Sequence, residues 1–222
     1  MDERKVVEAW RMFRIQAELV NGTEKLAKLG YAVSIYGSAR LPESSPHYQA
    51  ARKTGALFAR RGMAVITGGG PGIMEAANRG AHEAGGISVG LNITLPEEQS
   101  GNPYQTLSLD FRYFFVRKYM FVKHAVGFVI FPGGFGSMDE LFEVLTLIQT
   151  EKVKPFPIVL YGKKFWQGML EWIRESMVAE HCLREEELHL MHLVDTPEEV
   201  VDIIGQHYDA LIAAETSTPG GI

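Results

Sequence analysis

Short apolar runs alternate along the chain with longer segments of helical composition. Six runs carry almost continuous apolar side chains, over residues 31–37, 63–67, 86–93, 126–131, 157–162 and 189–194. Such runs are typical of strands that are buried on both faces of a parallel sheet. The segments between them have helical length and composition, over residues 46–61, 71–84, 112–125, 137–150, 164–179 and 196–213. This alternation predicts an α/β fold of the Rossmann-like, doubly wound type, with a mostly parallel sheet of about six or seven strands and helices on both faces.

An amphipathic helix is predicted ahead of this pattern, over residues 3–29. Its apolar residues recur at spacings of three or four, at Val6, Val7, Trp10, Phe13, Ala17 and Val20. The apolar stripe packs either on its own domain or on a second copy of the chain, and the sequence leaves both open. We expect a single domain over 1–222, with the N-terminal helix in 1–29, a Rossmann-like core over 30–214 and a flexible tail over 215–222.

Composition narrows the class of protein. The chain has 222 residues, of which 46% are hydrophobic, enough for one large domain with a sizeable core. A net charge of −5 argues against a general nucleic-acid binder. No apolar run approaches the ~18–20 residues of a membrane span, and the charged N-terminus is unlike a secretory signal. The single cysteine, Cys182, excludes an internal disulfide and fits a reducing cytosol, so we expect a cytoplasmic protein without nucleic-acid or membrane partners.

The first loop that could carry chemistry follows the run at 63–67 and leads into a helix. Its glycines include Gly69, Gly70 and Gly72, which would let backbone amides approach an anion at the helix N-terminus. A dinucleotide fingerprint is disfavoured because Glu75 replaces its third glycine and Asn92 stands where a ribose-binding acid is expected. The loop is therefore either a phosphate-binding loop or a tight turn, and four glycines exceed what a turn needs.

The second loop follows the run at 126–131 and contains Gly133, Gly134 and Gly136. Ser137 and Glu140 stand three residues apart behind it, in the spacing of a capping box, and residues 196–199 have the same form. A capping box does not need three glycines, whereas a loop around a ligand phosphate does. We therefore favour a ligand-binding loop over a purely structural cap.

The third feature is a basic stretch inside an acidic protein. No Asp or Glu occurs from residue 111 through 138, and this stretch carries Arg112, Arg117, Lys118 and Lys123. Its apolar neighbours predict a largely buried helix, and a buried arginine needs an anionic partner. Arg117 therefore either pairs with a structural carboxylate or has a functional role, in which it binds a phosphate or polarises a leaving group.

Other catalytic systems have no support in the sequence. It contains no Walker A motif, no HExxH, no CxxC and no GxSxG nucleophile elbow. His181, Cys182, His189 and His192 lie near one another, but their spacing matches no recognisable metal site. We expect neither a metal nor a cofactor.

Two segments, GGGPGIMEAANRGA (68–81) and PGGFGSMDE (132–140), with Arg117 and Lys118 between them, carry a family resemblance. Together they resemble the LONELY GUY (LOG) family of cytokinin riboside 5′-monophosphate phosphoribohydrolases, long named lysine decarboxylases. The resemblance runs from about residue 31 to 211 and is nearest to a longer bacterial branch, with an added N-terminal helix and segments 90–99 and 102–104.

The resemblance implies roles for particular residues. Arg117 and Glu140 match catalytic positions, and the substrate-binding positions match Gly69, Gly70, Gly72, Glu98, Lys118, Gly133, Gly134, Gly136 and Ser137. Ser137 replaces the usual threonine but keeps the hydroxyl. Pro71 and Glu75 depart from the plant-type first loop, which argues against a plant-type preference for cytokinin nucleotides more than against nucleotide hydrolysis.

Two classes of function follow. The first is a nucleoside 5′-monophosphate N-glycosidase, which releases a free purine or cytokinin base and ribose 5-phosphate from AMP or N6-modified AMP. Glycine-loop amides would anchor the phosphate, Glu140 would stabilise an oxocarbenium-like sugar, and Arg117 would assist the departing base. The alternative is a non-catalytic binding protein, either a sensor or a relative of the molybdenum-cofactor carriers. The preferred base and the choice between hormone synthesis and nucleotide salvage stay open.

A homodimer is also expected, from the resemblance and from the apolar residues of the central helices. These are Phe114, Phe115, Tyr119, Met120 and Phe121. An exposed apolar patch of that size would favour association.

Overall fold

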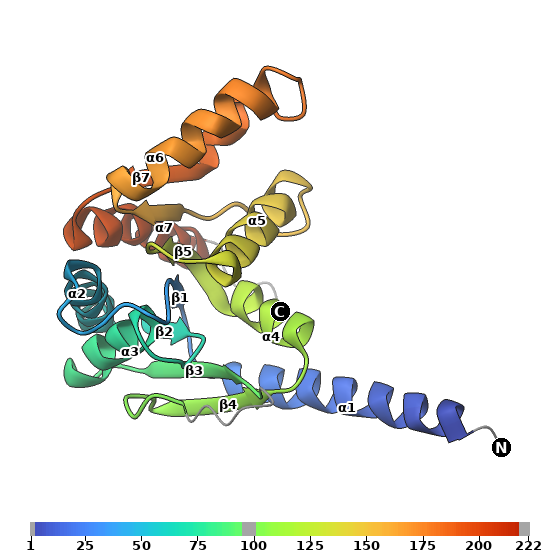
Figure 1. Ribbon diagram of the computed structural model, residues 1–222. Coiled ribbons are helices and arrows are strands. Elements are labelled where there is room, and N and C mark those ends of the chain that lie inside the picture. Colours follow the sequence, from blue (N-terminus) through green and yellow to red (C-terminus); the bar gives the residue numbers. More distant parts are fainter. Residues whose placement is uncertain (1–2, 95–100, 218–222) are drawn as a thin grey trace.

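Seven parallel strands form one sheet in the order β4-β3-β2-β1-β5-β6-β7 (Figure 1). The computed structural model describes residues 3–94 and 101–217. The strands are β1 Ala32–Tyr36, β2 Ala64–Thr67, β3 Ser88–Ile93, β4 Leu107–Phe111, β5 Ala125–Ile130, β6 Ile158–Tyr161 and β7 Met191–Val194. The predicted doubly wound α/β class is confirmed.

Helices cover both faces of this sheet. They are α1 Glu3–Leu26, α2 Pro46–Arg60, α3 Ile73–Glu83, α4 Phe114–His124, α5 Phe135–Gln149, α6 Lys163–Trp172 and α7 Pro197–Ser217. One core cluster joins the sheet to α1, α4, α5 and α6, and a second joins it to α2, α3 and α7. Within β1, Ala32 and Tyr36 belong to the first cluster and Val33 and Ile35 to the second, because successive strand residues point to opposite faces.

Side-chain caps fix two of the helix starts. Ser45 accepts a hydrogen bond from the His47 amide (3.3 Å), with Pro46 as the first residue of α2. At the start of α7, Thr196 Oγ1 accepts from the Glu199 amide (3.3 Å), while Glu199 Oε2 accepts from the Thr196 amide (2.9 Å). The capping box predicted at 196–199 is therefore present.

Some elements differ from the predicted ones. β4 was not among the predicted strands, and it lies at the edge of the sheet with only Leu109 and Phe111 buried. The helix predicted over 164–179 is α-helical only to Trp172 and continues as a π-helix over Ile173–Val178. α7 extends to Ser217, beyond position 215 where the tail was expected to begin, and residues 218–222 lie outside the described part.

The N-terminal helix packs on its own domain through Ile15, Leu19 and Leu26. Leu26 is fully buried and joins the first core cluster. Trp10, Phe13 and Val20, from the predicted apolar stripe, are between 62% and 65% exposed. Figure 1 shows the N-terminal end of α1 projecting beyond the sheet. These three side chains of the predicted stripe thus stay mostly exposed in the described part of the chain.

None of the helices in residues 3–94 and 101–217 combines the length and the apolar character that crossing a membrane requires.

Candidate functional site

The larger cavity opens at the carboxyl ends of β1, β2 and β5. The strand order reverses at β1, because β2 lies on one side of it and β5 on the other, and ligands of doubly wound folds bind at this switch point. The cavity has a volume of about 790 Å³. Its lining includes Tyr36, Gly37, Ser38, Ala39, Arg40, Gly68, Gly70, Met74, Ile93, Arg117, Phe121, Gly133, Gly134, Phe135, Gly136, Ser137, Met138 and Glu140. Both glycine loops and the predicted Arg117 and Glu140 are thereby brought to one site.

The second glycine loop enters α5 earlier than the sequence indicated. The helix begins at Phe135 with Gly134 as its N-cap, and no side chain caps it. Ser137 is therefore the third helical residue, and the capping box proposed for Ser137 and Glu140 is wrong. The first helical amides have no partner within a helix, and the residues that carry them line the cavity.

The glycines of this loop serve different purposes. A Cβ on Gly133 would collide with Ser137 Oγ, so the close approach of the backbone to Ser137 requires glycine there. A Cβ on Gly134 or Gly136 would meet nothing within 4 Å, and neither has a positive φ. The fold itself does not need these two glycines. Their missing side chains leave the amides open to a ligand, as a phosphate-binding loop requires.

Arg117 and Glu140 form a buried pair in the cavity wall. Arg117 Nη2 lies 3.9 Å from Glu140 Oε1, and the two side chains are 13% and 7% exposed. Burial raises the pKa of Glu140 to about 7, although the positive charge of Arg117 acts in the opposite direction. Burial also lowers the pKa of Arg117, while Glu140 acts to raise it. Such a perturbed pair in a cleft is characteristic of a functional site.

The guanidinium of Arg117 retains capacity to bind an anion. Its Nε is buried and has no hydrogen-bond partner in the described part of the chain. The guanidinium lies over the rings of Phe114 (5.2 Å) and Phe121 (5.7 Å), which hold it by cation–π contact. The carboxylate that pairs with Arg117 is thus the cavity's own Glu140, which favours the functional interpretation of this arginine.

Lys118 has a different setting from its neighbour. Its ammonium lies 2.9 Å from Asp139 Oδ2 and 3.0 Å from Glu143 Oε2, so it ties α4 to α5. Burial acts to lower the pKa of Lys118, but the hydrogen bonds to these two carboxylates outweigh it and raise the pKa. Lys118 is not among the residues that line the cavity, and its predicted contact with substrate stays a prediction.

The helix α4 is less buried than expected. Val116, Met120 and Phe121 are fully buried, whereas Phe114, Phe115 and Tyr119 are 50% to 55% exposed. The prediction of a largely buried helix was wrong because only one face of α4 packs against the sheet.

The first glycine loop contributes backbone rather than side chains. Gly68 and Gly70 line the cavity, whereas Gly69 and Gly72 are not among its lining residues. Gly72 has φ +67° and packs against the backbone of Ser38, which leaves no room for a Cβ. Glu75 accepts a hydrogen bond from the Tyr48 hydroxyl (2.8 Å) and so ties α3 to α2. Glu98 lies outside the described residues.

The loop after β1 also lines the cavity, although it was not predicted to do so. The Ser38 amide donates to the Pro132 carbonyl (3.0 Å), and the Ser38 carbonyl accepts from the Ile73 amide (3.0 Å). This loop therefore holds both glycine loops together, and Arg40 adds a cation at the cavity wall. The signal was available, because residues 37–40 directly follow a strand at the same edge of the sheet.

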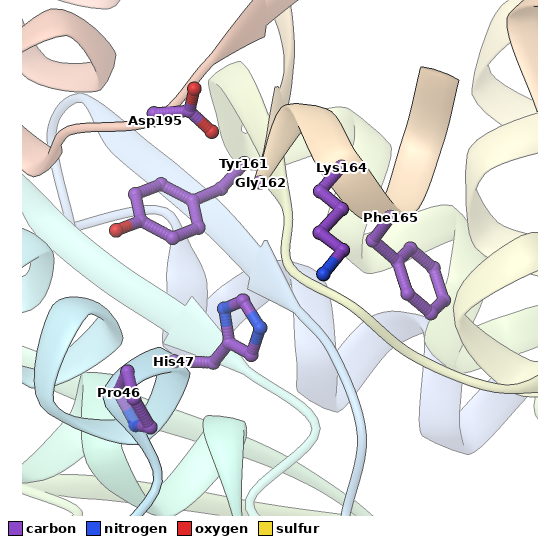
Figure 2. Close-up of a pocket in the computed structure, with 7 residues that line it drawn as sticks. All are labelled: Pro46, His47, Tyr161, Gly162, Lys164, Phe165 and Asp195. Carbon is purple, nitrogen blue, oxygen red and sulfur yellow. The ribbon is translucent and has the colours of Figure 1, made fainter. Parts of the chain in front are cut away.

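A second, smaller cavity of about 440 Å³ lies between the starts of α2 and α6. Figure 2 shows Lys164 reaching towards His47 beside Tyr161, with Asp195 on the far side of the tyrosine. Asp195 Oδ1 already accepts a hydrogen bond from the amide of Lys163, the first residue of α6, at 2.8 Å. This cavity contains no buried carboxylate and no glycine loop, so the larger one is the candidate active site.

Among residues 3–94 and 101–217, no group of three or more His, Cys, Asp and Glu side chains is placed to hold a metal ion.

Comparison with known proteins places this chain in a family. The model of the family described as "Possible lysine decarboxylase" matches residues 74–204, more than half of the chain. The rice (Oryza sativa subsp. japonica) cytokinin riboside 5′-monophosphate phosphoribohydrolase LOG is 25% identical over 172 residues, which cover 76% of this chain and 70% of the rice protein. The chain belongs to the LONELY GUY family. The pyrimidine/purine nucleotide 5′-monophosphate nucleosidase of Escherichia coli strain K12 is 29% identical to this LONELY GUY family member, over 69% of the chain and 36% of the E. coli protein.

Solved structures share the fold of this LONELY GUY family member. The X-ray structure of TM1055 has a TM-score of 0.61 and 27% identity, covering 79% of this chain and 99% of that one. The molybdenum cofactor carrier protein of Chlamydomonas reinhardtii has a TM-score of 0.60 and 19% identity, over 81% of this chain and 99% of that one. At that identity the carrier shows a common fold alone.

Proposed function

We propose that this chain is a nucleoside 5′-monophosphate phosphoribohydrolase, which cleaves the N-glycosidic bond and releases a free base and ribose 5-phosphate. The observation that carries the proposal is the buried Arg117–Glu140 pair, placed 3.9 Å apart in a cavity that both glycine loops also line. The relatives named phosphoribohydrolase and nucleotide 5′-monophosphate nucleosidase support the same reaction.

Each part of the reaction has a group suited to it. The free amides at the start of α5 and the Arg40 side chain can bind the 5′-phosphate. The ionised carboxylate of Glu140 can stabilise the positive charge that develops on the sugar as the bond to the base breaks. Water then supplies the oxygen at C1′ and the proton that the base takes up. Arg117 can donate a hydrogen bond to the base as negative charge accumulates on it.

The substrate we propose is a purine nucleotide, either AMP or an N6-modified AMP. Part of the cavity wall is apolar, formed by Met74, Ile93, Phe121 and Met138, and such a surface suits a flat base with or without an apolar substituent. Cytokinin activation and nucleotide salvage use the same chemistry, and the base preference separates them.

We also propose that the protein is a cytoplasmic homodimer without nucleic-acid or membrane partners. Phe114, Phe115 and Tyr119 on α4 are at least half exposed, and so are Trp10 and Phe13 on α1. Covering aromatic side chains of this number with a second copy would remove a large apolar area from water. The single, exposed Cys182 fits a reducing compartment.

The carrier alternative shares the fold but is disfavoured by one residue. A protein that only stores an anionic ligand gains nothing from a buried carboxylate in its binding cavity, where like charges repel. Glu140 is such a group. A hydrolase, by contrast, needs a carboxylate opposite the developing positive charge.

A substrate panel tests the proposal. The protein is incubated with AMP, GMP, CMP, UMP and N6-isopentenyl-AMP, and free base is measured by chromatography. We expect free base to be released from the purine monophosphates. The nucleotide that is cleaved fastest identifies the preferred base. Tight binding of a nucleotide without any base release would favour the carrier alternative and refute the hydrolase.

A further inference from the structure

Two polar side chains that are not among those lining the cavity form hydrogen bonds to the first glycine loop. Asn102 is buried, with 8% exposure, and its backbone amide donates to the Gly69 carbonyl at 2.8 Å. Its Nδ2 donates to the carbonyls of Gly69 (3.0 Å) and Gly70 (3.1 Å). Gln105 Nε2 donates to the Gly69 carbonyl as well, at 3.0 Å. We call Asn102 and Gln105 the strap.

The strap fixes the direction of one peptide N–H. The described residues contain no cis peptide bond, so the N–H of Gly70 points away from the Gly69 carbonyl in the same peptide plane. Since that carbonyl faces the strap, the Gly70 N–H faces the opposite side, and Gly70 lines the cavity. No group in the described part of the chain accepts a hydrogen bond from this N–H.

The backbone nitrogens on either side of Gly70 have no N–H free to bind a ligand. The Gly70 carbonyl is also held by the strap, but the next residue is Pro71, which has no N–H to turn. The Gly69 amide donates to Thr67 Oγ1 at 2.9 Å and is not available. Of these three successive backbone nitrogens, only that of Gly70 offers a free donor.

The strap is anchored in the sheet. Asn102 Nδ2 lies 2.9 Å from Asn78 Oδ1, which also accepts from the Thr67 hydroxyl at 2.6 Å. Thr67 ends β2 and Asn78 lies in the middle of α3. A peptide between two glycines rotates easily on its own. These hydrogen bonds therefore determine whether its carbonyl or its N–H is directed towards the cavity.

We propose that Asn102 is a positioning residue that turns the Gly70 N–H towards the phosphate of the substrate. It acts through the Gly69–Gly70 peptide and does not itself touch the ligand. The inference rests on the proposed function for the identity of the anion, a 5′-phosphorylated ribose. It extends that function by assigning a role to Asn102, to which the sequence alone gave none.

Binding of ribose 5-phosphate tests this role without turnover. Calorimetry in phosphate-free buffer compares the wild type with Asn102→Ala, Gln105→Ala and Thr54→Val. Thr54 is the control, a buried residue whose hydroxyl donates to the Ala50 carbonyl within α2. We expect Asn102→Ala to weaken binding by about 10- to 100-fold, as for loss of a hydrogen bond to a charged group. Gln105→Ala should have a smaller effect and Thr54→Val none.

Kinetics with AMP provide the second readout. In Asn102→Ala the KM should rise more than kcat falls, because the phosphate contact is lost while Glu140 and Arg117 are untouched. If Asn102→Ala does not fold, Asn102→Asp and Gln105→Ala decide the matter. The aspartate keeps the size of the side chain but places an acceptor against the two carbonyls, and it should weaken binding at least as much.

The outcomes separate this proposal from the proposed function. Wild-type affinity for ribose 5-phosphate in a destabilised Asn102→Ala protein would show that Asn102 only supports the fold, and it would overturn the positioning role even if AMP is cleaved. A wild type that binds ribose 5-phosphate but does not cleave AMP refutes the hydrolase and leaves the strap comparison valid. If the wild type cleaves AMP but binds ribose 5-phosphate too weakly to measure, the KM for AMP decides, and an unchanged KM in Asn102→Ala overturns the positioning role.

Discussion

At the scale of single residues, the proposed hydrolysis depends on the protonation state of Glu140. Its pKa is raised to about 7 because it is buried, although Arg117 lowers the cost of the charge. Only the ionised form can stabilise a positive sugar. We therefore expect kcat/KM for AMP to rise about tenfold per pH unit below pH 7 and to level off above it. A pH profile that is flat between pH 5.5 and 8 would contradict this role.

The same titration affects stability, with the opposite sign. Between pH 4.5 and about 7 the folded protein keeps a proton on Glu140 that the unfolded chain releases. The wild type should therefore lose stability relative to Glu140→Gln as the pH rises through this window, by on the order of 3 kcal/mol. Chemical denaturation of both proteins at pH 5 and pH 8 measures the difference. An unchanged difference would show that Glu140 titrates near its ordinary pKa.

Arg117 is expected to act on Glu140 as well as on the substrate. Replacing it with Met removes the charge that opposes the raised pKa of Glu140, so the pKa should rise further. The activity of Arg117→Met should be lower at every pH, and its rise should move to higher pH. Because a buried charge loses its partner in this variant, its melting temperature is measured alongside. A pH profile with the wild-type midpoint would show that the two groups are not coupled.

At the scale of elements, the start of α5 links the loop to the chemistry. Gly136 is helical, and a Cβ there meets nothing within 4 Å. Gly136→Ala should therefore raise stability by up to ~1 kcal/mol through helix propensity, while the added methyl group blocks the ligand and lowers kcat/KM. Gly133→Ala, which collides with Ser137, should destabilise instead. Thermal melts and AMP kinetics of both variants check this, and full activity in Gly136→Ala would remove the loop from the site.

The helices and strands also show how much of the fold could be predicted from the sequence. Strands buried on both faces, such as β1 and β5, are nearly continuous in apolar residues and were predicted. In the edge strand β4, Leu107, Leu109 and Phe111 alternate with polar residues. This strand therefore contains no continuous apolar run and was not predicted. The start of α5 was predicted too late, because Ser137 and Glu140 have the residue types and the spacing of a capping box. In the structure Gly134 is the N-cap, and the helix starts two residues earlier, at Phe135.

The candidate site also contains residues that could be predicted from the sequence and residues that could not. Arg117, Glu140 and the glycines could be found because they form local motifs around strand ends. The strap could not, since Asn102 and Gln105 reach Gly69 across more than thirty residues of sequence. Likewise, Lys118 stands next to Arg117 in the chain, but on a helix adjacent residues point in different directions, and Lys118 faces Asp139 and Glu143.

At the scale of the whole molecule, the exposed aromatic side chains predict association. Light scattering at micromolar concentration should give about twice the chain mass of 24.7 kDa. Phe115→Asp places a charge in the exposed face of α4 and should shift the protein towards monomer, and Trp10→Asp tests whether α1 shares the contact. A wild type that scatters as 24.7 kDa would contradict the dimer.

The most direct test of the account compares AMP hydrolysis by the wild type and Glu140→Gln. The wild type should release adenine and ribose 5-phosphate in equal amounts, and adenosine, which lacks the phosphate, should react far more slowly. Glu140→Gln should fold and bind ribose 5-phosphate, yet cleave AMP ~10²- to 10³-fold more slowly, as for loss of one preorganised electrostatic group. Wild-type rates in Glu140→Gln, or adenosine and phosphate as the products from AMP, would contradict the account.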